Sequence, residues 1–178
     1  MIEIKDISKN FGKLWALKNV NLSCNKGECI ALIGPNGCGK TTLIKSILGM
    51  VVPTSGKIFF NGEDIANNFL YRNNIGYMPQ IGRYPENMTI GHIVKMIKQI
   101  RNSDKALDED LLNEFDLPSL YEKRMRTLSG GTTQKVSATL AFLFNPDVLI
   151  LDEPTAGLDP LASEILKEKI IKEKEKGK

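Results

Sequence analysis

The sequence predicts an α/β fold in which a short antiparallel sheet precedes a core of strands and helices. Period-two alternation near the start indicates antiparallel strands. A glycine-rich stretch separates an apolar run from a helical pattern within residues 29–48. A second apolar run, residues 148–151, is followed by the two carboxylates of Asp152 and Glu153. These three observations predict the fold class.

Composition limits the class of protein. With 178 residues, 42% of them hydrophobic, the chain can bury one core and a small satellite. The net charge of +3 comes from scattered Lys and Arg, so no nucleic-acid partner is predicted. No apolar run approaches the roughly 20 residues of a spanning helix, and a strand pattern starts at Met1 without a signal peptide. The three cysteines and the single His92 show no metal-ligand spacing, so we expect reduced thiols in a cytoplasmic protein.

Residues 34–42 match the pattern G-x-x-x-x-G-K-[ST] at every fixed position. Residues 29–33 before them are apolar and predict a buried strand, and residues 41–48 after them predict a helix that Gly49 ends. Strand, loop and helix in this order favour a phosphate-binding loop over a plain glycine-rich turn. The residues predicted to bind the nucleotide here are Gly34, Pro35, Asn36, Gly37, Cys38, Gly39, Lys40, Thr41 and Thr42.

Polyphosphate chemistry explains these residue types. Glycines let backbone N–H groups approach the phosphates, and the following helix adds the positive end of its dipole. We expect Lys40 to reach the β- and γ-phosphates and the Thr41 hydroxyl to coordinate Mg²⁺. The chain is therefore predicted to bind a nucleoside triphosphate with magnesium. Cys38 lies inside this positive loop, so either its thiol is reactive and protected by nucleotide or it fills a small-residue position.

The remaining elements follow from the same patterns. In chain order, they are antiparallel strands at 2–4 and 17–22, a strand at 57–60 between two turns, a strand at 75–80, two helices within 89–115, a helix opened by Ser129 that ends before Pro146, and a helix from about 160. The charged tail at 172–178 mixes both signs on all faces and is predicted to be a solvated helix end.

An aromatic residue, Phe11, stands just before the glycine turn at Gly12 and ahead of the phosphate loop. Stacking on a purine suits this position, because base–aromatic contacts are worth about 1–3 kcal/mol whichever base is bound. We therefore expect Phe11 to bind the base, with a core position as the alternative and Trp15 as the rival aromatic.

Asp152 and Glu153 stand where a phosphate-loop enzyme needs carboxylates. A carboxylate at the C-terminal end of a strand can hold Mg²⁺, which assigns Asp152 to the metal. A second carboxylate beside it can orient or deprotonate the attacking water, which assigns Glu153 to catalysis. An apolar run before Asp-Glu is weak alone, but about a hundred residues after a phosphate loop it is a strong pattern.

With Leu128-Ser129-Gly130-Gly131 ahead of these carboxylates, the chain resembles the ATP-binding-cassette (ABC) ATPases over its whole length. The family's motifs occur in order, at Phe11, 34–42, Gln80, 128–131, 148–153 and 156–159. The resemblance implies an α/β P-loop NTPase with a RecA-like core, an N-terminal antiparallel β subdomain and a small helical signature subdomain. It implies a single cassette domain over 1–178, with the nucleotide-binding core at 1–82 and 146–178 and the helical subdomain at 83–145.

The resemblance also implies a role for each motif, with ATP as the nucleotide. Glu153 would be the general base, and Gln80 would contact both Mg²⁺ and the lytic water. Ser129 and the signature glycines would bind the γ-phosphate held by a second subunit, which gives a homodimer, or a heterodimer of cassettes, joined by ATP. Asp159 would lie in the loop that crosses to that subunit, or is just a helix N-cap.

Two features depart from the family pattern. The signature continues as residues 132–135, Thr-Thr-Gln-Lys, where many relatives have Gly or Gln and then Arg, although Gln134 is retained. The family's switch histidine follows a later core strand, whereas His92 precedes the signature and is predicted to be a helix-surface residue. We therefore expect a cassette that lacks the C-terminal end of the fold, binds ATP and hydrolyses it poorly.

The short region between Gln80 and Ser129 favours the motor of a membrane transporter. The alternative is a soluble cassette ATPase of the DNA-repair or ribosome-associated type. The former insert long coiled coils, whose heptads are absent here, and the latter join two cassettes in one chain. The partner would then be a separate integral membrane permease, with the cassette peripheral on the inner face of the cell membrane. Residues 77–90 also resemble the NosF-like subunits of nitrous-oxide-reductase maturation, which implies copper or sulfur cargo.

Overall fold

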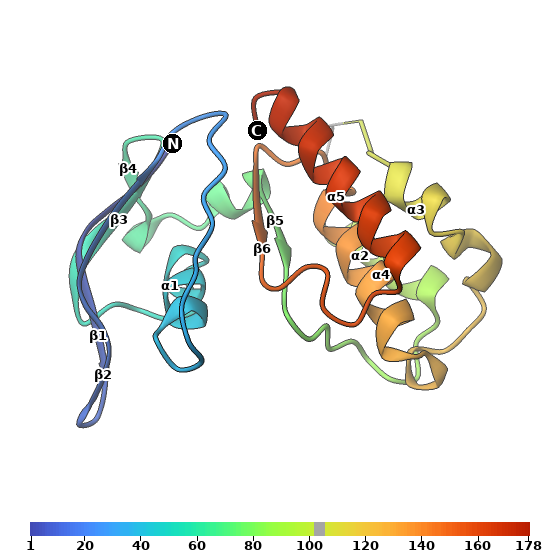
Figure 1. Ribbon diagram of the computed structural model, residues 1–178, viewed down its shortest axis with the longest axis horizontal. Coiled ribbons are helices and arrows are strands. Elements are labelled where there is room, and N and C mark those ends of the chain that lie inside the picture. The colour runs from blue at the N-terminus through green and yellow to red at the C-terminus, as the bar shows by residue number, and fades with distance from the viewer. Residues whose placement is uncertain (102–105) are drawn as a thin grey trace. The chain divides into compact units, whose positions relative to one another are not determined.

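The computed structural model describes residues 1–101 and 106–178, and an antiparallel sheet opens the chain (Figure 1). Its strands, in order across the sheet, are β2 (Leu14–Cys24), β1 (Ile2–Phe11), β3 (Ser55–Phe60) and β4 (Glu63–Asp64). The predicted alternation is present, since Ile2 and Ile4 are buried. A bulge between Ile4 and Ile7, where Asp6 has a φ of 50°, keeps Ile7 on the buried face.

The helix α1 (Lys40–Ile47) belongs to the same unit, which comprises residues 1–72 and 174–178. It ends as predicted, because Leu48 is the C-cap and Gly49 follows with a φ of 65°. Leu43, Ile44 and Ile47 bury the apolar face of the helix.

The segment 29–33 is not a strand. The buried strand that the sequence predicts for these residues is therefore wrong. It pairs with no strand among the described residues, and Ile30, Leu32 and Ile33 are exposed, Ile33 by 93%. An apolar run favours a buried strand, but a strand also needs neighbouring backbone to accept and donate its hydrogen bonds. The antiparallel sheet of this unit does not include the segment.

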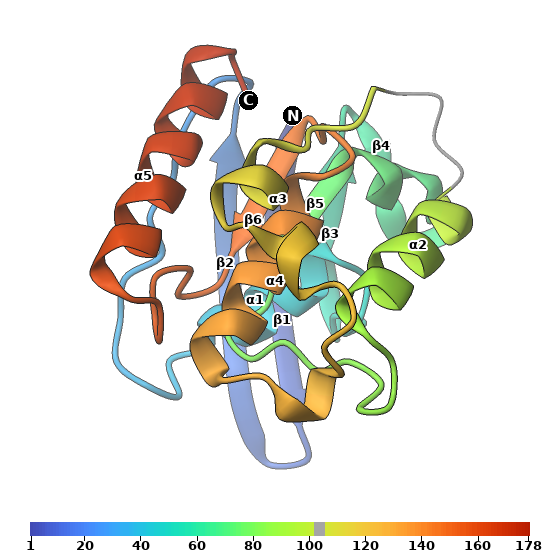
Figure 2. The same ribbon diagram turned by 90° about the vertical axis from the view of Figure 1, so that its right-hand side faces the viewer.

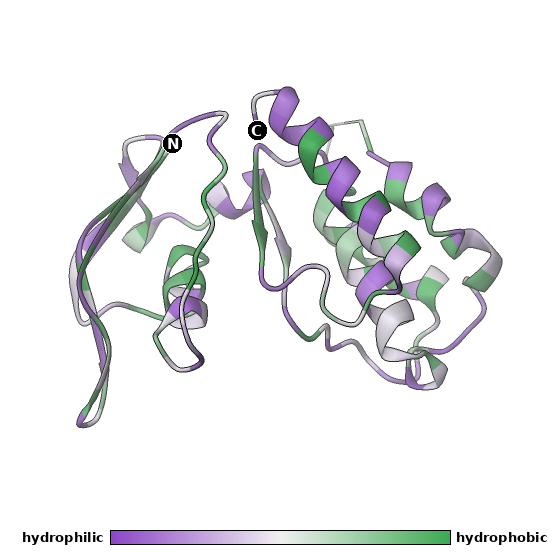
Figure 3. Cartoon of the chain, viewed as in Figure 1, coloured by the Kyte–Doolittle hydropathy of each residue, from purple (hydrophilic) through white to green (hydrophobic). Residues whose placement is uncertain are grey.

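The second unit, residues 73–173, contains the parallel pair β5 (Ile75–Met78) and β6 (Val148–Leu151), which lie side by side in Figure 2. Figure 3 shows β6 in the colour of hydrophobic residues, as its apolar sequence requires. The helices of this part of the chain are α2 (Ile90–Arg101), α3 (Asp110–Glu114), α4 (Gly130–Phe142) and α5 (Pro160–Glu175). Short 3-10 helices occur in this unit at Leu117–Leu120 and Met125–Thr127, in the first unit at Ile65–Asn67, and across the boundary in the chain at Leu70–Asn74.

The helix α4 lies at the centre of the second unit. Val136 and Ala138 are fully buried, and α2, α3 and α5 add residues such as Ile93, Leu111 and Leu166 to the same core. A Cβ at Gly76 of β5 would collide with the backbone of α4, so helix and strand are in close contact. This packing sets the position of the ends of β5 relative to α4.

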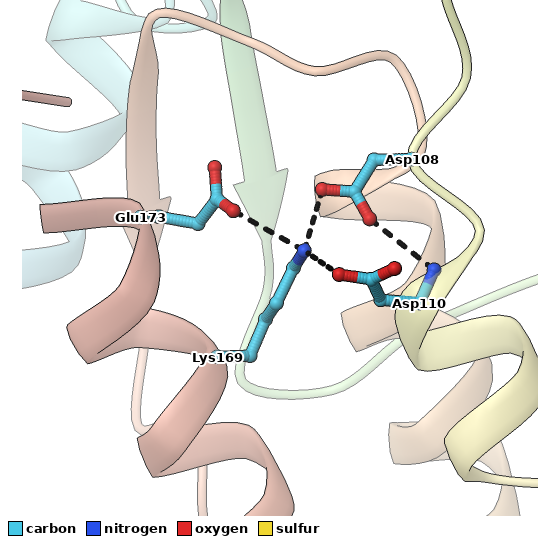
Figure 4. A network of polar contacts seen from close by, with 4 residues as sticks. All are labelled: Asp108, Asp110, Lys169 and Glu173. Atoms are coloured by element: carbon cyan, nitrogen blue, oxygen red, sulfur yellow. Dashed lines mark hydrogen bonds and ion pairs between the residues drawn. The ribbon is translucent and has the colours of Figure 1, made fainter. Parts of the chain in front are cut away.

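Lys169 of α5 is buried among carboxylates (Figure 4). Its Nζ lies 2.6 Å from Asp108, 2.8 Å from Asp110 and 3.2 Å from Glu173. Burial by itself lowers the pKa of Lys169, but the hydrogen bonds that its ammonium donates to these carboxylates outweigh burial and raise that pKa above its ordinary value. Glu173 is 1% exposed, so the prediction of a solvated helix end over 172–178 is wrong at this residue.

The antiparallel sheet and the parallel pair β5–β6 confirm the predicted α/β class. The division into a core at 1–82 and 146–178 and a helical subdomain at 83–145 stays a prediction. Residues 102–105, within the region predicted to be helical, lie outside the described residues. Among the residues described, 1–101 and 106–178, no helix combines the length and the apolar character needed to cross a membrane.

Candidate nucleotide-binding and catalytic site

The phosphate loop, residues 34–42, leads directly into α1. Gly39 is the N-cap with a φ of 101°, and a Cβ at this position would collide with the carbonyl oxygen of Ala16, so only glycine fits. Gly39 has no side chain that could cap the first-turn N–H groups of α1. Those groups are the ones that bind anions at helix N-termini.

The side chain of Lys40 points back into the phosphate loop. Its Nζ donates to the carbonyl oxygen of Gly34 over 2.6 Å and to that of Pro35 over 3.1 Å. The same Nζ is 3.9 Å from Cys38 Sγ, and the Cys38 side chain is exposed. The loop is therefore already folded around an ammonium group, whose charge favours an incoming phosphate chain.

Gln80 and Glu153 meet at one edge of the parallel pair. Gln80 follows β5, Asp152 and Glu153 follow β6, and Gln80 Nε2 donates to Glu153 Oε2 over 2.8 Å. Asp152 is buried, whereas the other two side chains are exposed. Glu153 has a φ of 51°, a left-handed conformation that costs a non-glycine residue about 1–3 kcal/mol and is typical of functional sites.

This edge carries the hard oxygen ligands that Mg²⁺ prefers. Asp152 supplies a carboxylate, and the amide oxygen of Gln80 remains for a cation because its nitrogen binds Glu153. Burial, and then the negative charge of Asp152, raise the pKa of the Tyr77 hydroxyl on β5. The donor set at the ends of these strands therefore fits magnesium, with the Thr41 hydroxyl as the predicted ligand from the phosphate loop.

Ser129 caps α4, as the sequence predicts. Its Oγ accepts a hydrogen bond from the Thr132 backbone N–H over 3.1 Å. Gly130 and Gly131 form the first turn, and a Cβ at Gly131 would lie 2.9 Å from the carbonyl oxygen of Gly157. The start of α4 thus presents a serine and two glycines close to the loop that follows β6.

Asp159 caps α5, which is the alternative that the sequence left open. Its Oδ1 accepts from the Ala162 backbone N–H over 2.8 Å, and its Oδ2 lies 2.8 Å from Lys135 Nζ on α4. The hydrogen bond from Lys135, and then that from Ala162, lower the pKa of the Asp159 carboxyl. A role of Asp159 toward a second subunit stays a prediction.

The two candidate aromatics for base stacking lie at the tip of the β1–β2 hairpin. Phe11 is 51% exposed and Trp15 is 48% exposed, so both rings are accessible. Lys9 Nζ lies 5.1 Å from the centroid of the Phe11 ring. The exposure contradicts a core position for Phe11, and the choice between the two rings stays a prediction.

Gln134 contacts the site, although no sequence pattern assigned it a role. The side chain is buried in α4, and its Nε2 donates to the backbone carbonyl oxygens of Gln80 and Ala156. The available signal was that Gln134 is retained in the signature pattern. Its partners could not be foreseen, because they are backbone atoms from distant parts of the chain.

The predicted site residues belong to two units. The phosphate loop and Phe11 lie in the first unit, and Gln80, the signature and the carboxylates lie in the second. Within the second unit, hydrogen bonds join Gln80 to Glu153 and to Gln134. His92 is exposed on α2, which confirms the prediction of a helix-surface residue.

Known proteins share both the sequence and the fold. The protein family described as "ABC transporter" matches residues 17–156. The sulfate/thiosulfate import ATP-binding protein CysA of Pectobacterium atrosepticum is 38% identical over 166 residues, which cover 89% of this chain and 50% of that protein. A solved ATP-binding subunit of an ABC transporter matches with a TM-score of 0.90 at 35% identity, covering 99% of this chain and 75% of that one. A dimeric ATP-binding cassette, solved in a post-hydrolysis state with ADP and Pi, matches with a TM-score of 0.87 at 26% identity, covering 100% and 85%.

The chain spans about half the length of the curated relatives it matches. The family match nevertheless extends over most of the chain, from the second strand to the loop after Glu153. The likeness to solved cassettes confirms the predicted cassette fold. The chain therefore belongs to the ABC transporter family and has the fold of its ATP-binding cassettes.

Proposed function

We propose that the chain is the ATP-binding and ATP-hydrolysing subunit of an ABC transporter and works with a separate membrane permease. The observation that carries this proposal is the 2.8 Å hydrogen bond between Gln80 and Glu153, beside the buried Asp152. An amide, a general base and a magnesium-binding carboxylate at one strand edge are groups that phosphoryl transfer to water uses. The similarity to a protein named as an import ATP-binding protein supports the transport role.

Binding begins at the phosphate loop. Lys40 exchanges the carbonyl oxygens of Gly34 and Pro35 for oxygens of the β- and γ-phosphates. The first-turn N–H groups of α1 bind the remaining phosphate oxygens, and Thr42 bonds the α-phosphate. Phe11 stacks on the base, which its exposure permits.

Hydrolysis depends on Glu153. A water attacks the γ-phosphorus, Glu153 accepts a proton from that water, and the bond to the β–γ bridging oxygen breaks, so that ADP and phosphate are released. Gln80 restrains the Glu153 carboxylate through its amide N–H. Thr41, Gln80 and Asp152 would hold Mg²⁺, which would neutralise charge on the phosphates.

A second cassette completes each site. Ser129, with Gly130 and Gly131 at the start of α4, binds the γ-phosphate of ATP held by the partner cassette, because a helix N-terminus is an anion site. The partner is a second copy of this chain or a related cassette. The dimeric state of a solved cassette with ADP and Pi supports this arrangement. Hydrolysis removes the γ-phosphate bridge, and the dimer opens.

The permease is proposed to contact the segment after Gln80. Arg83, Pro85 and Glu86 are exposed there, and Tyr84 anchors the segment to α4 through a 2.9 Å hydrogen bond between its hydroxyl and Ser137 Oγ. The cassette then works in the cytoplasm, peripheral on the inner face of the membrane. The permease selects the cargo, and the NosF-like resemblance implies copper or sulfur.

Purification and turnover test the proposal. The chain is expected to bind MgATP, to release phosphate, and to co-purify with an integral membrane protein. In the Glu153→Gln variant, MgATP is expected to produce a dimer, which analytical sedimentation would detect. Failure to bind MgATP overturns the proposal. Co-purification with ribosomes or DNA in place of a membrane protein overturns the transport role.

A further inference from the structure

One side chain, Gln134 on α4, connects segments that are far apart in the sequence. Its Nε2 donates over 2.9 Å to the carbonyl oxygen of Gln80, which follows β5. The same atom donates over 3.3 Å to the carbonyl oxygen of Ala156, in the loop that follows β6. Gln134 is 7% exposed, so both hydrogen bonds form largely away from water.

The chemistry of this position requires a side chain with donors. Both partners are carbonyl oxygens, and an amide nitrogen carries two N–H groups on a single atom. The amide oxygen, Oε1, is buried and has no hydrogen-bond partner within the part of the chain that the structure describes. Leaving a buried acceptor unsatisfied is unfavourable, so the benefit of Gln134 must come from its two donated bonds.

Neighbouring positions on α4 contact the same two segments. A Cβ at Gly82, after Gln80, would collide with Ser137 Oγ, so the first segment lies directly against the helix. On the other side, Lys135 is paired with Asp159 over 2.8 Å. The first half of α4 therefore contacts the segment after Gln80 and the loop after Glu153 at more than one point.

From these contacts we propose that Gln134 is a positioning residue for hydrolysis, which rests on the function proposed above. Gln80 is held at two points, by its carbonyl oxygen to Gln134 and by its side-chain amide to Glu153. Gln134 also restrains the loop that begins at Glu153, through Ala156. It thus sets the position of Gln80 relative to the general base without touching the nucleotide.

The proposal predicts a specific kinetic effect. A displacement of about 1 Å in a catalytic group can cost roughly 100-fold in rate, so a partial loosening is expected to lower kcat about tenfold. The phosphates are held by the loop at 34–42, in the other unit, so KM for ATP is expected to change less than about twofold.

Gln134→Met and Gln134→Glu test the two donated bonds. Methionine keeps the length of the side chain and removes both donors, and glutamate keeps the shape but directs an acceptor at two carbonyl oxygens. The matched control is Gln99→Met, the same substitution at an exposed glutamine of α2. As a rescue, lowering the pH is expected to restore part of the activity of Gln134→Glu, because the protonated acid donates one hydrogen bond.

Hydrogen exchange of the folded chain supplies a readout that does not depend on turnover. In Gln134→Met, the hydrogen-bonded amides of Ala156 and Leu158 are expected to exchange about tenfold faster, while those of α2 keep the wild-type rate. Unchanged exchange of these two amides overturns the proposal, as does wild-type kcat in a folded variant. If wild-type protein shows no ATP turnover, the proposed function fails, and the exchange result alone decides whether Gln134 positions these segments.

Discussion

The amide of Gln80 donates to the carboxylate of Glu153 over 2.8 Å, although the two residues are 73 positions apart in the chain. Met78 and Leu151, the last residues of β5 and β6, are register partners, and each site residue stands two positions beyond its strand. The strand register therefore aligns the two side chains. A slip of one residue would turn one side chain to the other face of the pair.

The first prediction concerns Glu153 as the general base. Glu153→Gln keeps a side chain of the same size beside Gln80 but removes the proton acceptor. Turnover is expected to fall roughly 100-fold or more, with ATP affinity largely retained. Phosphate release and equilibrium ATP binding measure the two quantities. Glu122→Gln, at an exposed carboxylate of the same unit, is the control and should keep the wild-type rate. Wild-type turnover in Glu153→Gln would exclude this role.

The second prediction concerns Lys40 in the phosphate loop. Lys40→Ala removes charge-assisted hydrogen bonds to the phosphates, which are worth about 1.5–3 kcal/mol, so ATP affinity is expected to fall roughly 10- to 100-fold. Calorimetric titration with MgATP measures the change. Lys45→Ala removes an exposed lysine from the same helix and should leave affinity unaltered. Equal affinities for the two variants would contradict the proposed binding mode.

The third prediction concerns the Cys38 thiol. Its Sγ is exposed and lies 3.9 Å from Lys40 Nζ, so a bound polyphosphate would cover it. Alkylation of Cys38 is expected to block nucleotide binding, and saturating MgATP is expected to slow the alkylation. Mass spectrometry gives the labelling rate of each cysteine, and exposed Cys29 is the internal control. A Cys38 rate that is the same with and without ATP would refute the prediction.

The fourth prediction concerns the buried charge network of α5. Lys169→Met leaves the carboxylates of Asp108 and Glu173 without their cation, and breaking a buried ion pair in this way typically costs about 3–5 kcal/mol. Urea unfolding should show that loss of stability. Lys167→Met disrupts an exposed pair with Glu164 and should change stability by less than about 1 kcal/mol. A similar change in the free energy of unfolding for both variants would mean that the network contributes little to stability.

The same network predicts how stability changes at alkaline pH. Because the pKa of Lys169 is higher in the folded chain than its ordinary value, its contribution is complete below about pH 10.4 and is lost as the pH rises further. In Lys169→Met, this part of the loss of folding stability at alkaline pH should be absent. Unfolding curves above pH 10 for wild type and variant give the comparison.

Local features were predictable from the sequence alone. Gly39 and Lys40 follow from the phosphate-loop pattern, and Ser129 is a typical N-cap of the helix that follows it. The family resemblance placed Gln80 at Mg²⁺ and the lytic water and made Glu153 the general base, but it did not predict the hydrogen bond between the two side chains. No periodicity in the sequence specifies the register of two strands when one precedes the helical region in the chain and the other follows it.

Segment 29–33 and Glu173 show where the sequence misled. The apolar run at 29–33 has the composition of a buried strand, but no neighbouring strand accepts its hydrogen bonds among the described residues. Glu173 lies in a charged tail, but it is one turn beyond Lys169 and is buried with it. Burial depends on which elements pack against a segment, and composition does not state that.

The sequence by itself determined the chemistry of this protein: a glycine-rich loop with its lysine, carboxylates after an apolar run, and a capped signature helix. Tertiary structure alone decided which groups meet, namely Gln80 with Glu153, and Gln134 with the backbone of both flanking loops. The physical reason is that local patterns arise from neighbours in the chain. A hydrogen bond to a distant carbonyl oxygen leaves no such pattern, because every residue carries the same carbonyl group.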